Sequence, residues 1–375
     1  MQKKCFNISE NSKIYVYCPS GIITGGVELL HQLVDIINQN GGNAFIVYYG
    51  NQPHSIPNEY KKYNIKIAEQ IIDIEDNILV LPEVKFNESL KYSKIQFLFW
   101  WLSVDNFFYS HQNELKLTDL FNFSYNIGKK SLVPHLKNII KKIIHYKSYK
   151  KIFSINKLLT NRQIVYNCYQ SEYAKQFLLS KKITNIYPLG DYINDDYSQS
   201  TISTEKENII LYNPKKGFDY TKKIIQKASE LNWQPIENMT RSQVKDLMKK
   251  SKIYIDFGNH PGKDRLPRES RLQGCVVITG KNGSAKYYED VPIEEKFEKK
   301  SKNINDIVTL IKKIFNNYDF YNNKQLNYTK KIKNEKKEFE NNVKNIFFNI
   351  QNVGGGYKQL TKLKIAAFLS QKEAA

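Results

Sequence analysis

Residues 14–49 read IYVYCPSGIITGGVELLHQLVDIINQNGGNAFIVYY. The runs at the two ends, residues 14–17 and 44–49, are short and apolar, as is typical of buried strands. Between them, apolar residues recur every three or four positions over residues 26–39, which predicts a helix with one apolar face. A strand, a glycine-containing loop, a helix and a second strand, in this order, predict one unit of a parallel α/β sheet.

The same alternation continues along the chain and starts again after a polar interruption. Further strand-like runs lie at residues 77–81, 95–101, 164–168, 209–212, 253–257 and 275–279. The interruption, YSQSTISTEKEN at residues 197–208, has the composition of a linker. The pattern therefore predicts an N-terminal domain over residues 1–196, a C-terminal domain over 209–350 and a tail over 351–375. Two Rossmann-like domains with a cleft between them would bind ligands beyond the carboxyl ends of their strands.

Several helix ends can also be predicted from side chains that cap them. One helix should open at Ser171 or Glu172, and Asp219 is placed to cap another. Thr240 and Gln243 have the spacing of a capping box, in which each side chain bonds the backbone of the other residue. These signals predict that helices follow the strands in both halves of the chain.

The composition limits the classes of function. The chain of 375 residues carries a formal net charge of +20, which fits a phosphorylated ligand, a membrane surface or nucleic acid. A lysine-rich composition explains the charge equally well, so charge alone identifies no partner. The four cysteines lack paired spacing, which argues against disulfides or a zinc site. The sequence shows neither the apolar core of a signal peptide nor an apolar run of membrane-spanning length. We therefore expect a cytoplasmic location.

The loop NPKKG, residues 213–217, is the first candidate binding element. It lies between a predicted strand and a predicted helix. Backbone N–H groups at a helix N-terminus attract anions, and Lys215 and Lys216 add positive charge. The spacing is not that of a Walker loop. An ordinary basic turn is the alternative.

A second candidate is HPGKDRLPRESRLQGCVVITG, residues 260–280. Arg265, Arg268 and Arg271 lie here, and the whole chain has only five arginines among its 57 basic residues. Arginine offers a rigid fork that matches phosphate or carboxylate, which lysine does not reproduce. The cluster therefore indicates an anion that is held in a fixed geometry. Local ion pairing with acidic neighbours is the alternative.

Two further elements have both a functional and a structural interpretation. Glu269 is placed to accept hydrogen bonds from sugar hydroxyls, or simply to complement a helix dipole. The loop GIITGGVE, residues 21–28, lets the backbone approach a ligand closely, or serves as a tight turn. Because this loop lacks the G-x-G-x-x-G pattern, a nicotinamide cofactor is not expected.

Over roughly residues 13–350, the chain resembles group 1 glycosyltransferases of the GT-B fold. Three elements carry the resemblance: the loop Gly25-Gly26-Val27-Glu28, the pair Lys216-Gly217, and the strand–loop–Glu–helix–turn–strand segment that ends in CVVITG. The resemblance implies that Lys216-Gly217 binds the donor diphosphate and that Glu269 is the terminal glutamate of the Glu-x7-Glu motif, which holds the donor ribose. The segment NGSAKYYEDV (282–291), with Ser284, resembles the following loop near the donor.

The chain departs from this family at two points. Pro261 stands where the first glutamate of Glu-x7-Glu is found, and the arginine that accompanies the Lys-Gly pair is missing. Lys215 would take the place of that arginine, or Arg265 or Arg268 would reach in from the neighbouring loop, which also carries Lys263. NPKKG together with GNHPGKDRLPRE resembles a branch found among bacterial surface-polysaccharide synthesis proteins.

The resemblance implies transfer of a sugar from a nucleotide diphosphate to a hydroxyl of a glycan or lipid-linked glycan, in capsule or lipopolysaccharide synthesis. This reaction is expected to need no metal or other cofactor and to retain the anomeric configuration. An inverting enzyme would instead need a base in the N-terminal domain. Asp105, His111 and His260 are the candidates for a catalytic or acceptor contact.

Residues 129–157 are basic and amphipathic, and would fit an anionic membrane leaflet or a helix packed on the core. Two other classes of function stay open. The missing motif residues allow a non-catalytic or regulatory protein with the same fold. Nucleic-acid binding has only the charge in its favour, because no recognisable binding module occurs.

Overall fold

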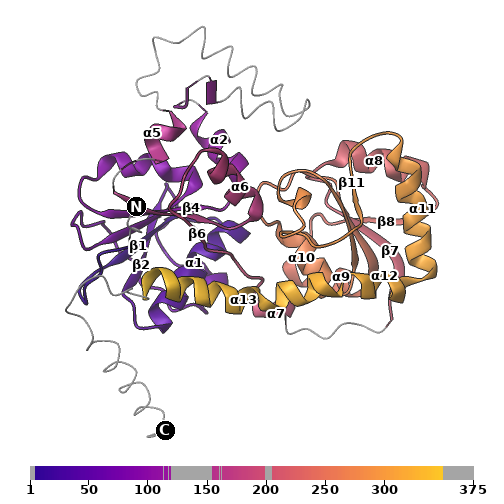
Figure 1. Cartoon of the computed structure of the whole chain (residues 1–375). Coiled ribbons are helices and arrows are strands. Elements are labelled where there is room, and N and C mark those ends of the chain that lie inside the picture. Colours follow the sequence, from indigo (N-terminus) through magenta and orange to yellow (C-terminus); the bar gives the residue numbers. More distant parts are fainter. Residues whose placement is uncertain are drawn as a thin grey trace, which may run out of the picture.

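The chain forms two α/β domains that lie side by side, and one long helix passes along both of them (Figure 1). Each domain is built on a parallel sheet. The computed structural model describes residues 5–112, 114–116, 118–119, 154–159, 161, 163–198 and 205–348. Parts of three predicted segments lie outside these residues: the linker at 199–204, the basic helix at 129–153 and the tail at 351–375.

The N-terminal sheet has six parallel strands in the order β2-β1-β3-β4-β5-β6. Ile14 pairs with Ala44 on one side and with Ile78 on the other, which fixes the register at the centre of the sheet. The strands are β1 (Ile14–Pro19), β2 (Ala44–Tyr49), β3 (Ile78–Pro82), β4 (Gln96–Trp101), β5 (Ile164–Tyr169) and β6 (Ile186–Pro188).

Both faces of this sheet are buried, which explains why its strands are apolar without interruption. Alternate residues of β1 point to opposite faces: Val16 belongs to one apolar cluster and Tyr15 to the other. The helices of this domain include α1 (Gly25–Gln39), α2 (Val104–His111), α5 (Ile155–Leu159) and α6 (Glu172–Ser180).

The C-terminal sheet has five parallel strands in the order β11-β10-β9-β7-β8. The strands are β7 (Glu207–Tyr212), β8 (Asn232–Pro235), β9 (Ser251–Asp256), β10 (Val276–Gly280) and β11 (Lys296–Phe297). The short helix α7 (Asp195–Ser198) lies between the two sheets in the chain. The helices that follow are α8 (Phe218–Lys227), α9 (Arg241–Lys250), α10 (Arg265–Leu272), α11 (Asn303–Asn316), α12 (Tyr318–Lys324) and α13 (Leu326–Phe347).

Each sheet has one point at which the chain reverses the direction in which it adds strands. In the first sheet the chain adds β2 on one side of β1 and then β3 on the other side. In the second sheet β8 and β9 flank β7 in the same way. Loops that leave adjacent strands in opposite directions open a crevice at the carboxyl edge, where ligands bind in such sheets. The fold therefore places one crevice in each domain.

Helix α13 returns from the C-terminal domain to the N-terminal domain (Figure 1). It contacts α10 and α12 near its start and α1 further along. Its apolar face near the end, with Phe339, Val343 and Phe347, belongs to the same cluster as Trp100 of β4. The predicted C-terminal domain over residues 209–350 therefore ends in a segment that packs on the N-terminal core. Burial of side chains of this size contributes roughly 2 kcal/mol each.

Most predicted helix ends are confirmed, and one is wrong. Ser171 caps α6, and Thr240 with Gln243 forms the capping box of α9. Asp219 does not cap α8, because the helix already begins at Phe218 and its N-cap is Gly217. Among the described residues, no helix combines the length and the apolar character needed to cross a membrane.

Candidate functional site

A cleft of about 580 Å³ lies between the carboxyl edges of the two sheets. The loops after β1 and β3 line it from one domain, and the loops after β7 and β9 line it from the other. These loops flank the two points of strand reversal, so both crevices open into one site. The charged residues that line the cleft are Glu83, Asp191, Lys216, Asp256, Lys263, Asp264 and Arg265.

The loop after β7 places a lysine at the N-terminus of α8. Gly217, the N-cap, has a φ of +64°, and a Cβ there would lie 2.3 Å from the Phe257 carbonyl oxygen. Only glycine therefore lets this loop pack against the loop after β9. Lys216 lines the cleft, and its ammonium lies 2.8 Å from the Asp264 carboxylate. The first N–H groups of the helix and this ammonium together form an arrangement of the kind that attracts anions.

Three titratable side chains meet behind Lys216, in the loop after β9. Asp256 ends β9, His260 follows in the loop, and Asp264 is the N-cap residue of α10. The His260 ring lies 3.5 Å from a carboxylate oxygen of Asp256 and 3.7 Å from one of Asp264. Burial lowers the pKa of His260, but the two carboxylates outweigh this effect and the pKa is raised. His260 is buried and does not line the cleft, so a direct catalytic contact through its ring does not fit this arrangement.

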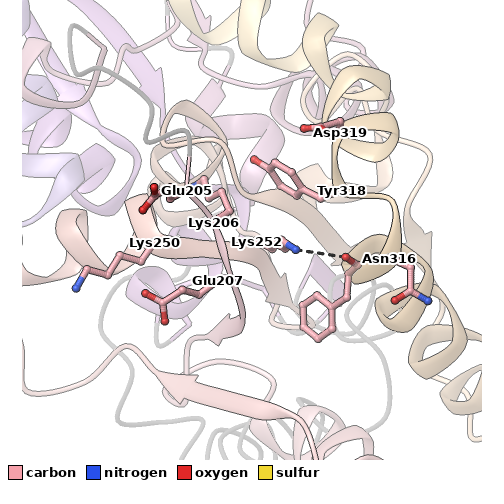
Figure 2. A pocket seen from close by; sticks show the side chains of 9 residues that line it. Glu205, Lys206, Glu207, Lys250, Lys252, Asn316, Tyr318 and Asp319 are labelled. Atoms are coloured by element: carbon pink, nitrogen blue, oxygen red, sulfur yellow. Dashed lines mark hydrogen bonds between the residues drawn. The ribbon is translucent and has the colours of Figure 1, made fainter.

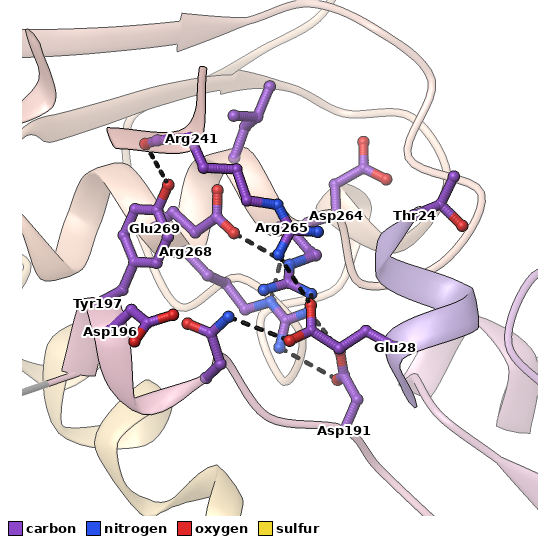
Figure 3. Close-up of polar contacts among 12 residues, drawn as sticks. Thr24, Glu28, Asp191, Asp196, Tyr197, Arg241, Asp264, Arg265, Arg268 and Glu269 are labelled. Carbon is purple, nitrogen blue, oxygen red and sulfur yellow. Dashed lines mark hydrogen bonds and ion pairs between the residues drawn. The ribbon is translucent and has the colours of Figure 1, made fainter. Parts of the chain in front are cut away.

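Arg265 joins the two domains through carboxylates on both sides (Figure 3). Its guanidinium lies 2.6 Å from Glu28 of α1 and 3.0 Å from Glu269 of α10. Glu28 is buried and also accepts hydrogen bonds from Asn194 and Tyr63. Burial raises the pKa of Glu28, but Arg265 outweighs it, so that the pKa is lowered and the carboxyl stays charged. The predicted ribose ligand Glu269 is thus paired with Arg265.

Arg268 and Lys263 do not act as a phosphate clamp in this structure, because the protein's own carboxylates hold them. Arg268 lies 2.5 Å from Asp191 and 2.8 Å from Glu335 of α13, and Lys263 lies 3.3 and 2.8 Å from the same two residues. Arg268 and Glu335 are fully buried. The two positive and two negative charges therefore balance. Their cluster connects α10 and α13 with the segment that follows β6. Its position indicates a structural role.

Arg271 serves a similar purpose away from the cleft. Its guanidinium donates to Thr329 and Asn322 side chains at 2.7 and 2.5 Å and to the Cys275 carbonyl at 2.9 Å. The three clustered arginines thus hold carboxylates, carbonyls and polar side chains of the protein itself in fixed geometry. These contacts correspond to the local pairing that was the alternative to a ligand clamp.

The other predicted donor residues lie at different depths around the cleft. Gly25 and Gly26 line it, and a Cβ on Gly25 would lie 2.4 Å from the Arg265 side chain. Ser284 is buried and donates to the Gly262 carbonyl at 2.6 Å, so it supports the loop from behind. Lys215 is exposed and is not among the described residues that line the cleft.

Asp105 and His111 lie on α2 but do not line the cleft. Asp105 accepts hydrogen bonds from Tyr173, at 2.8 Å, and from Asn259 of the C-terminal domain. It therefore joins the domains. His111 is buried, with its Nδ1 2.9 Å from the Phe107 carbonyl oxygen, and burial lowers its pKa to about 4. A neutral, enclosed imidazole of this kind fits a structural role.

Glu83 is a cleft residue that the sequence interpretation missed. It follows β3 directly and lines the N-terminal domain's side of the cleft, where its carboxylate accepts from the Leu102 backbone N–H at 3.2 Å. Burial raises its pKa to about 8. An acidic residue directly after a buried strand was the available signal, since strand ends point into the crevice. Asp256, the last residue of β9, carries the same signal.

Replacing Glu83 with glutamine is expected to stabilise the protein above about pH 5. The folded protein holds this pKa near 8, against an ordinary 4.5, so the carboxyl favours folding only when protonated. Wild-type stability should therefore fall as pH rises through this window, by up to about 4 kcal/mol, while the variant escapes that loss. Urea unfolding at several pH values measures this, with the exposed Glu69→Gln as the matched control. Parallel wild-type and variant curves would contradict it.

A second hollow, of about 630 Å³, lies at the opposite edge of the C-terminal sheet (Figure 2). Two of its three lysines are already engaged: Lys206 donates to three backbone carbonyls, including Met248 at 3.0 Å, and Lys252 donates to Asn208 at 2.7 Å. Glu205, Glu207 and Asp319 place negative charge in the same hollow. It has no excess of positive charge, because its three acidic residues match its three lysines, so the interdomain cleft is the better candidate site for an anion.

Solved structures with the same architecture are known. A glycosyltransferase from Rickettsia africae ESF-5 is similar with a TM-score of 0.51 and 16% identity, covering 92% of this chain and 100% of that one. A sucrose-phosphate synthase from Thermosynechococcus elongatus is similar with a TM-score of 0.51 and 10% identity, covering 97% and 100%. No protein-family model and no curated protein matches the sequence. Likeness at such low identity concerns the fold, and the chain has the GT-B fold, with two Rossmann-like domains that face each other across a cleft.

Proposed function

We propose that the protein is a glycosyltransferase that moves a sugar from a nucleoside-diphosphate sugar to a hydroxyl of a glycan or lipid-linked glycan. One observation carries the proposal: Lys216 stands at the N-terminus of α8 and faces the interdomain cleft of a GT-B fold. A diphosphate is the kind of anion that a lysine and free helix N–H groups bind together. The cleft of about 580 Å³ has the size of a small-molecule site.

In the proposed reaction, the bond between the sugar and the diphosphate breaks as the acceptor hydroxyl attacks. Negative charge grows on the leaving diphosphate, and fixed positive groups lower the barrier by stabilising it. In this proposal Lys216 and the first N–H groups of α8 stabilise the leaving diphosphate, and the reaction needs no metal ion. Arg265 lines the same cleft and would add a second cation if the donor displaced Glu28 or Glu269 from it.

The proposed transfer retains the configuration of the sugar, with the leaving diphosphate assisting the incoming hydroxyl on the same face. Inversion would require a base on the acceptor side, and Glu83 favours that alternative, because its carboxyl lines the cleft there with a pKa of about 8. Proton NMR of the product distinguishes the two outcomes, since it reports the anomeric configuration directly.

The wider role that we propose is synthesis of a bacterial surface polysaccharide such as capsule or lipopolysaccharide, in the cytoplasm and at the inner face of the membrane. The motifs NPKKG and GNHPGKDRLPRE support this role through their resemblance to proteins of that class. The formal net charge of +20 fits contact with an anionic leaflet.

A thermal-shift panel with UDP, GDP, CMP and ADP tests the proposed function. We expect one nucleotide to raise the unfolding temperature by the same amount with and without EDTA. The corresponding nucleoside, which lacks the phosphates, should have little effect. No shift with any of the four would contradict the donor site. Mass spectrometry for sugar transfer or hydrolysis separates an enzyme from a non-catalytic protein, and RNA and DNA binding assays address the remaining alternative.

A further inference from the structure

His260 lies behind the donor side of the cleft and is held in place by its backbone. Its carbonyl accepts from the Ser284 N–H at 2.8 Å, within a parallel bridge to Gly283. The side chain is 1% exposed. Any effect of this residue on a ligand must therefore pass through its neighbours.

The two ring nitrogens of His260 face two different carboxylates. Nε2 lies 3.5 Å from Asp256 Oδ1, and Nδ1 lies 3.7 Å from Asp264 Oδ2. A neutral imidazole carries only one N–H, so its other nitrogen would turn a lone pair toward a carboxylate. An imidazolium places a positive charge beside both, and its two N–H groups would give a partner to the two ring nitrogens, which have no hydrogen-bond partner among the described residues. The buried arrangement is therefore complementary to the charged form of the ring.

The charged groups around the ring are Asp256, Asp264 and Lys216. Asp256 is held on its other side by the Tyr254 hydroxyl at 3.0 Å and by the Gly258 N–H at 2.8 Å. Asp264 is shared between His260 and the Lys216 ammonium, which is 2.8 Å away. With His260 charged, two cations balance two carboxylates.

We propose that His260 is a fixed positive charge that positions Lys216 for an anionic ligand, acting through Asp264; that the ligand is a donor diphosphate rests on the proposed function. A charged His260 neutralises part of Asp264, so that Lys216 can turn toward the diphosphate. A neutral His260 leaves two carboxylates with Lys216 as their only cation in this group. Lys216 then stays on Asp264, and the excess negative charge repels the ligand.

A shared metal ion is the competing explanation for this cluster. Ligand atoms of Asp256, His260 and Asp264 lie within 4.8 Å of one another. However, the two ring nitrogens point at separate carboxylates, and Asp264 already holds an ammonium. The arrangement therefore favours a proton on His260.

Two measurements test the proposal. NMR of histidine side chains follows the titration of His260, identified by its absence in His260→Gln, with the exposed His54 as the internal reference. Calorimetry then follows the binding of UDP, GDP and ADP between about pH 6 and about pH 9, for the wild type, His260→Gln and the matched control His54→Gln. Asp264→Asn serves as a second variant if His260→Gln does not fold.

We expect His260 to titrate at a higher pH than His54, and Asp264→Asn to lower that pH. Nucleotide affinity of the wild type should fall about tenfold relative to His260→Gln as pH rises through this titration, while His54→Gln follows the wild type. A His260 that is neutral below the titration of His54, or Zn²⁺ or Mn²⁺ binding that His260→Gln abolishes, would overturn the inference alone. A charged His260 in a protein that binds none of the nucleotides would overturn the donor site and, with it, the role of His260 in donor binding.

Discussion

Replacing Arg268 with methionine is expected to destabilise the protein by about 3–5 kcal/mol. The fully buried guanidinium bonds Asp191, Glu335 and the carbonyl of Lys263. Without it, two buried carboxylates share only the Lys263 ammonium, and an uncompensated buried charge is costly. Urea unfolding followed by tryptophan fluorescence measures the loss. Because the cluster joins α10 to α13, we expect both domains to unfold earlier.

Arg241→Met is the matched control for this experiment. The Arg241 side chain is 48% exposed and lies 3.7 Å from Glu28, so its loss should cost less than about 1 kcal/mol. Arg268→Lys keeps the charge but loses the planar guanidinium that bonds several oxygens at once, so an intermediate loss of stability is expected. A cost for Arg268→Met no larger than for Arg241→Met would show that the four charges do not hold the domains together.

Replacing Lys216 with alanine is expected to weaken binding of the nucleoside diphosphate about 10- to 100-fold. A charge-assisted hydrogen bond to the diphosphate contributes about 1.5–3 kcal/mol, and the change removes it. Folding should be only modestly affected, because the Lys216 side chain is 40% exposed, although its partner Asp264 is only 15% exposed. Calorimetric titration with the nucleotide chosen by the thermal-shift panel measures the affinity.

Lys223→Ala is the control for this second experiment. Lys223 is exposed on α8 and is not among the described residues that line the cleft. The Lys223→Ala substitution removes the same charge from a nearby position, so it corrects for any general electrostatic effect. Equal affinities of the two variants would show that Lys216 does not contact the diphosphate.

The apolar strands at the centre of both sheets could be predicted because burial on two faces leaves a continuous apolar run. The strands that escaped prediction are at or near the sheet edges. β8 reads NWQP, with two polar residues and a proline, and β11 has only two residues. Such short edge strands lack the periodicity on which sequence interpretation depends.

The candidate site was predictable where its signal is local. Lys216-Gly217 stands between a strand and a helix, and the structure places Lys216 in the lining of the interdomain cleft. Arg268 was assigned to the donor for the same reason, but its partners Asp191 and Glu335 are 77 and 67 residues away. No local pattern can show such partners. The sequence therefore indicated the kind of anion, a fixed carboxylate or phosphate, without showing that the protein supplies it.

Helix α13 has a consequence for synthesis of the chain on the ribosome. All strands of the first sheet have been translated by Pro188, but the apolar surface around Trp100 is covered only when Phe339 and its neighbours emerge. The first domain must therefore persist with an open core while the whole second sheet is made. Apolar surface that stays exposed for this long during translation favours binding by chaperones. The arrival of helix α13 thus sets the time at which the core of the first domain can close.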